Sequence, residues 1–293
     1  MNIGLIRYTK FRSAGLFYLA DRVQEVLPEI KTVSADDTSH PFYVKNLPSI
    51  IDSFDALLLL ETYFNAELIF EFSKLKRPII LIPMWEYLPN LGEMKNYISH
   101  VFCLNQKSFD ATKTWTVPRH KGFYPLKEQE SLGKKTANTF FIIAGNNGQG
   151  RRRIDLLNTA NKDRKFNINL FITRPPPFPV PNLNLICKTF PTPQDIYRVA
   201  GDVHIFLSNL EGLGMPVYES IERNLPTFCS NSPPYDQEIL PFFLVDHTVD
   251  SVRKLLEKYN GKSIAHLKTW CQSFVKERSF SLFRKSFLSF IET

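Results

Sequence analysis

Residues 202–230 have the sequence DVHIFLSNLEGLGMPVYESIERNLPTFCS, and this stretch decides the fold of the second half of the chain. The apolar run at 202–208 predicts a strand, the EGLGM after it predicts a turn, and the apolar spacing at 216–224 predicts a helix. A second strand is expected at 226–230. Strand, turn, helix and strand in this order form one unit of a parallel α/β sheet, in which ligand-binding loops follow the strands.

The same alternation continues on both sides of this stretch. The sequence predicts strands at 2–8, 55–60, 77–83, 100–105, 139–145, 167–173 and 183–187, and helices at 16–27, 66–75, 151–161 and 193–201. Strands that are apolar throughout and alternate with helices indicate parallel sheets covered on both faces. Residues 117–137 are rich in proline, glycine and charge, and we interpret them as a linker between two doubly wound domains, 1–125 and 136–271.

The composition is that of a globular protein. The 293 residues are 43% hydrophobic and 22% charged, and this length suits two domains of ordinary size. The four cysteines are scattered without zinc-ligand spacing, so we expect reduced core residues in a reducing compartment. No apolar run approaches the roughly 20 residues of a membrane-spanning helix, and the N-terminus lacks a signal-peptide pattern. These features predict a cytoplasmic protein, either free or held peripherally at a membrane.

The positive charge is concentrated at the C-terminal end. The net charge is +7, and residues 251–293 alone hold nine Lys or Arg against three Glu. Such a basic end can bind phosphates, duplex DNA or an anionic membrane surface, or it can be a solvated helical face. Apolar residues recur there at helical spacing, namely Phe280, Phe283, Phe287 and Ile291. They predict either a helix resting on an anionic membrane or, as we favour, a helix whose phenylalanines pack in the core.

The EGLGMP turn has the composition of a ligand-binding loop. Gly212 and Gly214 allow the backbone to approach a ligand closely and to present amides. A helix that begins at Pro216 favours electronegative oxygens at its N-terminus. Glu211 and Glu219 can both accept hydrogen bonds from the hydroxyls of one polyhydroxylated ligand. The alternative for Glu219 is a structural acid in the first turn of the helix, where the helix dipole stabilises it.

Residues 195–239 resemble the signature of the family 4 glycosyltransferases, whose fold is GT-B. In that family a strand leads into the motif S-x-x-E-G-x-G-x-P-x-x-E-A. The matching positions here are Asp202, Ser208, Glu211, Gly212, Gly214, Pro216 and Glu219, and the departures are Gly201, Ser220 and Asn224. The resemblance covers most of the second half of the chain. It implies two Rossmann-like doubly wound domains facing each other across a cleft, with a C-terminal helix at about 272–293 crossing back to the first domain.

The resemblance also implies roles for individual residues. Glu211 would hold hydroxyls of the transferred sugar, and Glu219 would bind the ribose diol of a nucleotide sugar. Further contacts to the donor would come from Ser208 and from the amides near Gly212, Leu213 and Gly214. The donor would be a UDP- or GDP-sugar, and no metal would be required.

A basic stretch after the strand at 139–145 would neutralise the diphosphate of the donor. The family has an Arg there and a Lys five residues on; Arg152 falls at the position of the Lys and Asn147 at that of the Arg. Arg151 or Arg153 would then supply the second contact. A fixed guanidinium stabilises the negative charge of a departing diphosphate. The alternative is a solvated helix start, but three cations there oppose the helix dipole, and this conflict favours a functional role.

The first half of the chain matches the family more weakly. Gly15 of FRSAG follows the first strand, where the family has a glycine-rich turn near the sugar and phosphates, and Arg12 is a second candidate there. Glu86 of PMWEYLP matches a Trp-Glu segment of the acceptor cleft in some members, and would contact or activate the acceptor hydroxyl. The alternative is a turn with Trp85 packed in the core. His100 precedes a strand and is interpreted as structural.

Several other chemistries lack their motifs. The sequence contains no D-x-D of a manganese-dependent GT-A enzyme, and no G-x-G-x-x-G, G-x-S-x-G, H-E-x-x-H or P-loop. The resemblance implies a metal-independent transferase that retains the anomeric configuration, with the leaving phosphate accepting the proton of the acceptor. We favour a glycan or lipid-linked sugar as acceptor. One alternative is a DNA-modifying glycosyltransferase acting on hydroxymethylated bases of phage-type DNA, and another is a non-catalytic nucleotide-sugar-binding protein, which Asn147 favours.

Overall fold

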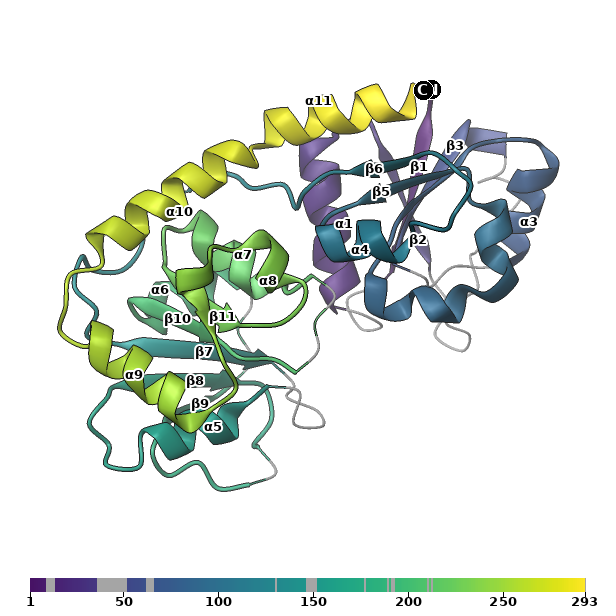
Figure 1. The fold of residues 1–293 in the computed structure, drawn as a ribbon. Helices are drawn as coiled ribbons and strands as arrows, with labels where there is room; N and C mark the ends of the chain where they lie inside the picture. Colours follow the sequence, from purple (N-terminus) through teal and green to yellow (C-terminus); the bar gives the residue numbers. More distant parts are fainter. Residues whose placement is uncertain are drawn as a thin grey trace. The chain divides into compact units, whose positions relative to one another are not determined.

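The chain has an α/β fold with two parallel sheets. The computed structural model describes residues 1–8, 14–35, 52–61, 66–129, 131–145, 152–176, 178–188, 190, 193–209, 211 and 213–292. The chain divides into two compact units, the first comprising Met1–Pro125 and Arg278–Thr293 and the second Leu126–Glu277. Each unit contains one six-stranded sheet with helices packed against it (Figure 1).

The sheet of the first unit has the order β2-β1-β3-β4-β5-β6, and all its strands run parallel. Its strands are β1 (Ile3–Tyr8), β2 (Lys31–Ala35), β3 (Ala56–Leu60), β4 (Ile79–Ile82), β5 (His100–Cys103) and β6 (Arg119–Lys121). The helices between them are α1 (Ala14–Val26), α3 (Ala66–Lys74), η1 (Trp85–Tyr97) and α4 (Gln106–Ala111). The central strands β3 and β4 are buried along their whole length, because helices cover both faces of a parallel sheet.

The last helix, α11 (Phe280–Ile291), belongs to the first unit. It buries Phe283, Phe287 and Phe290, whose rings lie 5.4, 5.1 and 5.9 Å from the ring of Phe102 on β5. The helical spacing of these phenylalanines therefore reflects core packing. This face of α11 is covered by protein and is not free to rest on a membrane. Among the described residues, no helix is both long and apolar enough to cross a membrane.

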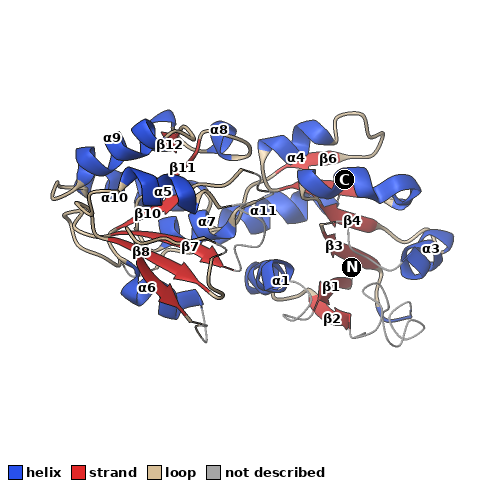
Figure 2. Cartoon of the chain, turned by 90° about the horizontal axis from the view of Figure 1, so that it is seen from below, coloured by secondary structure: helices blue, strands red, loops and turns tan. Residues whose placement is uncertain are grey.

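The sheet of the second unit has the order β12-β11-β10-β7-β8-β9 and is also parallel. Its strands are β7 (Phe140–Gly145), β8 (Ile168–Ile172), β9 (Asn184–Cys187), β10 (Val203–Phe206), β11 (Thr227–Ser230) and β12 (Leu244–Val245). Its helices are α5 (Ile154–Ala160), α6 (Pro193–Ala200), α7 (Met215–Glu222), α8 (Tyr235–Glu238), η3 (Pro241–Phe243), α9 (Val249–Tyr259) and α10 (Ala265–Glu277). Helices α5 and α9 lie on one face of this sheet and α6 on the other (Figure 2).

The strand order places a ligand-binding position in the second unit. The chain runs from β7 outward to β8 and β9, and then returns to β10 on the other side of β7. Ligands of open α/β sheets commonly bind beside such a reversal, at the carboxyl ends of the strands. Asp202 stands at the amino end of β10, away from these carboxyl ends. Its carboxylate accepts hydrogen bonds from the backbone amides of Lys134, Asn138 and Thr139.

Several sequence predictions differ from the structure. Residues 117–137 are not wholly a linker, because β6 lies within them and pairs with β5. The RHK sequence of β6 has no apolar residue to signal a strand, but His120 stacks on Phe102 and hydrogen-bonds Ser286 of α11 at 2.7 Å. Strand β2 and helix α4 were also not predicted. Three cysteines are buried as expected, whereas Cys187 is exposed on the edge strand β9.

Candidate functional site

The loops after β7 and β10 are joined through their backbones. Arg152 and Ser208 form an isolated antiparallel bridge, and the amide of Arg153 donates to the carbonyl of Leu207 at 3.1 Å. Since Arg152 follows β7 and Ser208 follows β10, this bridge joins the two loops at the point where the strand order reverses. Asn147 and Arg151, which were predicted to contact the diphosphate, lie outside the described residues.

The bridge brings Arg152 to the carboxylate of Glu211. The guanidinium Nη1 of Arg152 donates a hydrogen bond to Oε2 of Glu211, and Ser208 Oγ donates to the same oxygen at 3.3 Å. Both charged side chains are largely buried, with 14% and 12% of their surface exposed. The guanidinium also lies over the ring of Phe206, 4.1 Å from its centroid. Charge-assisted hydrogen bonds at low exposure are strong, so this pair is a defined feature of the site.

The glycine turn depends on the absence of a side chain at Gly214. Gly214 has φ +70°, and a Cβ there would lie 1.7 Å from the hydroxyl oxygen of Tyr235. Gly214 is also the N-cap residue of α7. Leu213 beside it is buried, and Gly212 lies outside the described residues. Only glycine combines this left-handed conformation with such a close approach of a neighbouring ring.

Tyr235 is a member of the site that the sequence did not predict. It is fully buried, its ring packs edge-on against Phe206, and burial followed by the nearby Glu211 carboxylate raises its pKa well above the usual range. Its hydroxyl has no hydrogen-bond partner in the described part of the chain. Tyr235 therefore stays protonated, as a donor that faces the Glu211 loop.

Glu219 lies one residue deeper in its helix than predicted, beyond the first turn. It is the fifth residue of α7, so the explanation by a first-turn acid stabilised by the helix dipole is wrong. Its carboxylate accepts a hydrogen bond from the hydroxyl of Tyr197 at 2.9 Å, and Arg223 lies over the Tyr197 ring at 4.5 Å. Burial and the Glu219 carboxylate raise the pKa of Tyr197, which keeps the phenol neutral as the donor of this bond.

The two described arginines of the RRR stretch have different partners. Arg153 is the N-cap residue of α5 and donates two hydrogen bonds, of 3.0 and 2.8 Å, to Asp155. The hydrogen bond from Arg153 lowers the pKa of Asp155. Helix α5 begins at Ile154 rather than at 151, and Asp155 offsets the charge of Arg153 at its start. The expected conflict between this cation and the helix dipole is therefore relieved, and of the two described arginines Arg152 is the one that contacts Glu211.

His204, near this site, is structural. It is fully buried in β10, where its ring stacks on Phe141 at 4.7 Å and its Nδ1 shares a hydrogen bond of 2.9 Å with Ser220 Oγ. Burial, with a smaller contribution from Arg152, lowers the pKa of His204 to about 3. The ring is therefore neutral at ordinary pH. Ser220, one of the departures from the family pattern, has a packing role as the partner of His204.

The predicted residues of the first half belong to the first unit. Gly15 lies in the first turn of α1 and is exposed, while Arg12 lies outside the described residues. Glu86 is the second residue of η1, a 3-10 helix where the sequence predicted a turn, and it is partly exposed. Trp85 beside it is also partly exposed, and Lys107 lies over its ring at 5.3 Å. His100 packs edge-on against Phe290 of α11, and burial lowers its pKa.

Within the described ranges, no three His, Cys, Asp or Glu side chains are grouped so that they could hold a metal ion. Among the described residues of this site, Arg152 supplies a positive charge, and it is held between Glu211 and the Phe206 ring.

Solved structures share this fold over the whole chain. A lipopolysaccharide outer core galactosyltransferase, WaaB, has a TM-score of 0.66 at 12% identity, with 99% of both chains covered. HepE from Anabaena, in complex with UDP and glucose, has a TM-score of 0.69 at 10% identity, covering 100% of this chain and 99% of HepE. An alpha-glucosyltransferase bound to UDP and a 13-mer DNA with an HMU base has a TM-score of 0.63 at 10% identity, with 100% of both chains covered.

These likenesses show that the chain has the GT-B fold, with two Rossmann-like units. Other similar structures belong to longer chains, of which this chain covers between 55% and 62%. No family model matches the sequence, and no curated protein does. The fold is therefore established by structure alone.

Proposed function

We propose that this chain is a glycosyltransferase that moves a sugar from a nucleotide-diphosphate sugar to an acceptor hydroxyl. The observation that carries the proposal is the Arg152–Glu211 pair, with Ser208, at the point where the strand order of the second unit reverses. A guanidinium and a carboxylate side by side suit a donor that has both a diphosphate and sugar hydroxyls. The motif resemblance and the GT-B fold support the same chemistry.

In this proposal, binding of the donor breaks the Arg152–Glu211 ion pair. The diphosphate takes the guanidinium of Arg152, and Glu211 is then released to accept hydrogen bonds from the sugar hydroxyls. Amides near Gly212, Leu213 and Gly214 assist at the sugar, and Glu219 binds the ribose diol, for which Tyr197 already orients its carboxylate. Ser208, Arg151 and Asn147 complete the proposed donor-binding set, with a minor contribution from Arg153, which is paired with Asp155. A UDP- or GDP-sugar meets these requirements.

The proposed reaction retains the anomeric configuration. The acceptor oxygen attacks the anomeric carbon from the face that the diphosphate leaves, and the acceptor proton passes to the departing phosphate oxygen. Arg152 stabilises the charge that builds on the diphosphate, so that the step needs no metal ion. In the first unit, Gly15 would border the donor, and Glu86 would contact or activate the acceptor hydroxyl.

For the acceptor we propose a glycan or a lipid-linked sugar. WaaB, named for a lipopolysaccharide core, is one similar structure of this kind, but a likeness at 12% identity does not determine an acceptor. The alternative of hydroxymethylated DNA is not favoured, although one similar structure holds DNA. At the basic end, Arg284 is already paired with Glu29 at 2.6 Å, within the first unit. A salt titration of binding to duplex DNA tests the alternative, since phosphate contacts weaken steeply with salt.

Nucleotide release from a panel of UDP- and GDP-sugars tests the proposed function. We expect turnover with at least one donor, and a loss of about 10³-fold in Glu211→Ala, because the sugar loses its carboxylate partner. Glu257→Ala, at an exposed acid of α9, is the matched control and should retain activity. Full turnover in Glu211→Ala would refute the site, and donor binding without any turnover would support the non-catalytic alternative.

A further inference from the structure

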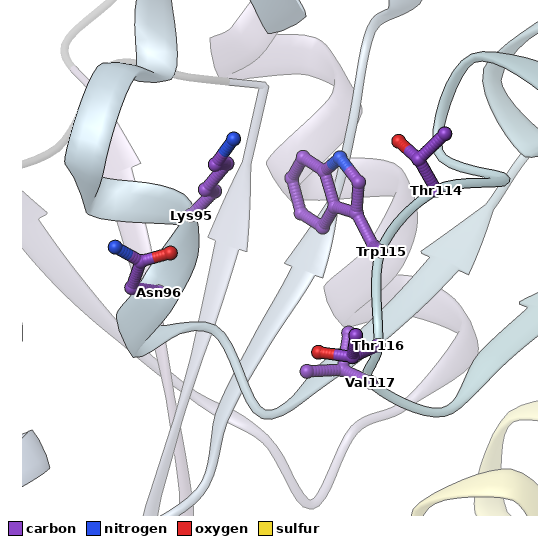
Figure 3. Close-up of a pocket in the computed structure, with 6 residues that line it drawn as sticks. All are labelled: Lys95, Asn96, Thr114, Trp115, Thr116 and Val117. Carbon is purple, nitrogen blue, oxygen red and sulfur yellow. The ribbon is translucent and has the colours of Figure 1, made fainter.

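The first unit contains a cavity that the donor chemistry does not use. It has a volume of about 300 Å³ and is lined by Lys95, Asn96, Thr114, Trp115, Thr116 and Val117 (Figure 3). This volume lies at the lower end of the range for sites that bind small molecules. One wall is the last turn of η1, and the other is the segment between α4 and β6.

The cavity lies at the amino ends of its neighbouring strands. η1 ends just before β5, and residues 114–117 lead directly into β6, which runs parallel to β5. Ligands of open α/β sheets bind at the carboxyl ends of strands. A substrate of a doubly wound fold is expected at the carboxyl edge of a sheet. In the first unit, the cavity therefore lies at the other edge of the sheet.

Backbone hydrogen bonds hold both walls in place. On the η1 side, the amide of Ile98 donates to the carbonyl of Lys95 at 3.3 Å, and Ser99 bonds to Ile79 of β4 at 2.9 Å. On the other side, the amide of Trp115 donates to Thr112 at 3.0 Å. The backbone of both walls is therefore held by hydrogen bonds, and a ligand has to order only the lining side chains on binding.

The lining combines one aromatic face with several available polar groups. In Figure 3, the Lys95 side chain extends from η1 on one side of the Trp115 indole, and the hydroxyl of Thr114 lies on the other side of the ring; Asn96 also lines the cavity from η1. In the described part of the chain, no side-chain hydrogen bond or ion pair engages Lys95, Asn96, Thr114 or Thr116. An ammonium, an amide and hydroxyls around one indole offer several donors and acceptors to a ligand with many hydroxyls.

We propose that this cavity binds one sugar unit of an anionic glycan. The negative face of the Trp115 ring attracts the polarised C–H face of a pyranose, while Asn96 and the threonines bond its hydroxyls. Lys95 has no carboxylate partner among the described residues, so it favours a sugar that carries a carboxylate or sulfate. The site is separate from the donor site, and its existence does not depend on turnover.

Titration with two oligosaccharides tests the proposal without any activity measurement. Hyaluronan tetrasaccharide provides anionic pyranoses and maltotetraose provides neutral ones, and their affinities can be measured by ligand-observed NMR. We expect the hyaluronan fragment to bind more tightly. Trp115→Ala should weaken its binding about tenfold or more, since the aromatic platform is lost. Lys95→Gln should abolish the preference for the anionic ligand and leave the weaker neutral binding in place.

Matched variants separate a local effect from a folding defect. Asn96→Ala changes an exposed residue and should weaken binding severalfold without changing the melting temperature. Tyr97→Ala removes an exposed aromatic of η1 that packs on Phe70 and does not line the cavity, so it should leave binding unchanged. The proposal is overturned if neither oligosaccharide binds, if Trp115→Ala and Asn96→Ala bind as well as the wild type, or if UMP binds there in preference to both sugars.

Discussion

The loop after β10 and the segment after β4 both follow a buried central strand and both carry a glutamate, but they differ in how that glutamate is held. Glu211 accepts hydrogen bonds from Arg152 and Ser208, and 12% of its side chain is exposed. Glu86 is only partly buried, on a 3-10 helix, in a segment whose resemblance rests on a few residues. A long motif thus predicts a glutamate whose side chain is held by its neighbours. A short match predicts only where in the chain a glutamate stands.

The largest effect is expected at the turn that shapes the loop after β10. Gly214→Ala places a Cβ against the hydroxyl of Tyr235 at a positive φ, so α7 or Tyr235 must move. We expect a loss of at least about 2 kcal/mol in the free energy of unfolding, together with loss of donor turnover. Chemical denaturation measures the first effect. Gly92→Ala, also at positive φ but with no atom near its Cβ, is the control for backbone strain alone.

A second comparison concerns the neighbouring arginines. Arg152→Ala should lower donor turnover by about 10²–10³-fold, because the charge on the leaving diphosphate loses its partner. Arg153→Ala should lower it by less than about fivefold, because that guanidinium is already paired with Asp155 in its own helix. Steady-state kinetics on both variants measure this difference. A larger loss of turnover in Arg153→Ala than in Arg152→Ala would reverse our assignment.

His204 gives the second unit a pH-dependent stability. Its pKa is lowered to about 3 in the folded protein, so between about pH 6.5 and 3 the unfolded chain binds the extra proton. Stability therefore falls as the pH falls through this window, by up to about 1.4 kcal/mol per pH unit from this group. His204→Phe should remove this contribution, which unfolding at several pH values would detect. An unchanged pH slope in the variant would show that His204 has the same pKa in the folded and the unfolded chain.

The smallest effect is expected at Glu86. Glu86→Gln should lower turnover by less than about threefold, because Glu86 is only partly buried on η1, whereas Glu211 is largely buried beside Arg152. Kinetics with the natural acceptor hydroxyl, or with water as acceptor, would measure the change. A loss near that of Glu211→Ala would show that the two loops contribute equally and that Glu86 acts as a base.

The sequence predicts the strands better than it predicts the site. Apolar runs such as ALLLL in β3 and IILI in β4 indicate buried strands by themselves. In contrast, RHK in β6 becomes a strand only through its pairing with β5. The motif predicts Glu211 as a ligand. It does not predict the pairing of Glu211 with Arg152, because these residues are 59 positions apart and the backbone bridge between Arg152 and Ser208 brings them together.

Tyr235 is a second feature of the site that the sequence does not predict. Nothing in its own neighbourhood in the sequence marks it as a site residue. It becomes one because Gly214 lacks a side chain, and that space allows the Tyr235 ring to reach the loop. Such close approaches between distant segments depend on packing, and a pattern of residue types along one chain does not encode them directly.

The most direct test of the central claim is the affinity of UDP and GDP for the wild type, Arg152→Ala and Glu211→Gln, measured by calorimetry. These nucleotides carry the diphosphate but no sugar, so Arg152 should attract them while Glu211 competes for the same guanidinium. We predict that one nucleotide binds the wild type, that Arg152→Ala binds it at least about tenfold more weakly, and that Glu211→Gln binds it more tightly. Equal affinity in Arg152→Ala and the wild type, or weaker binding in Glu211→Gln, would contradict this assignment of the donor site.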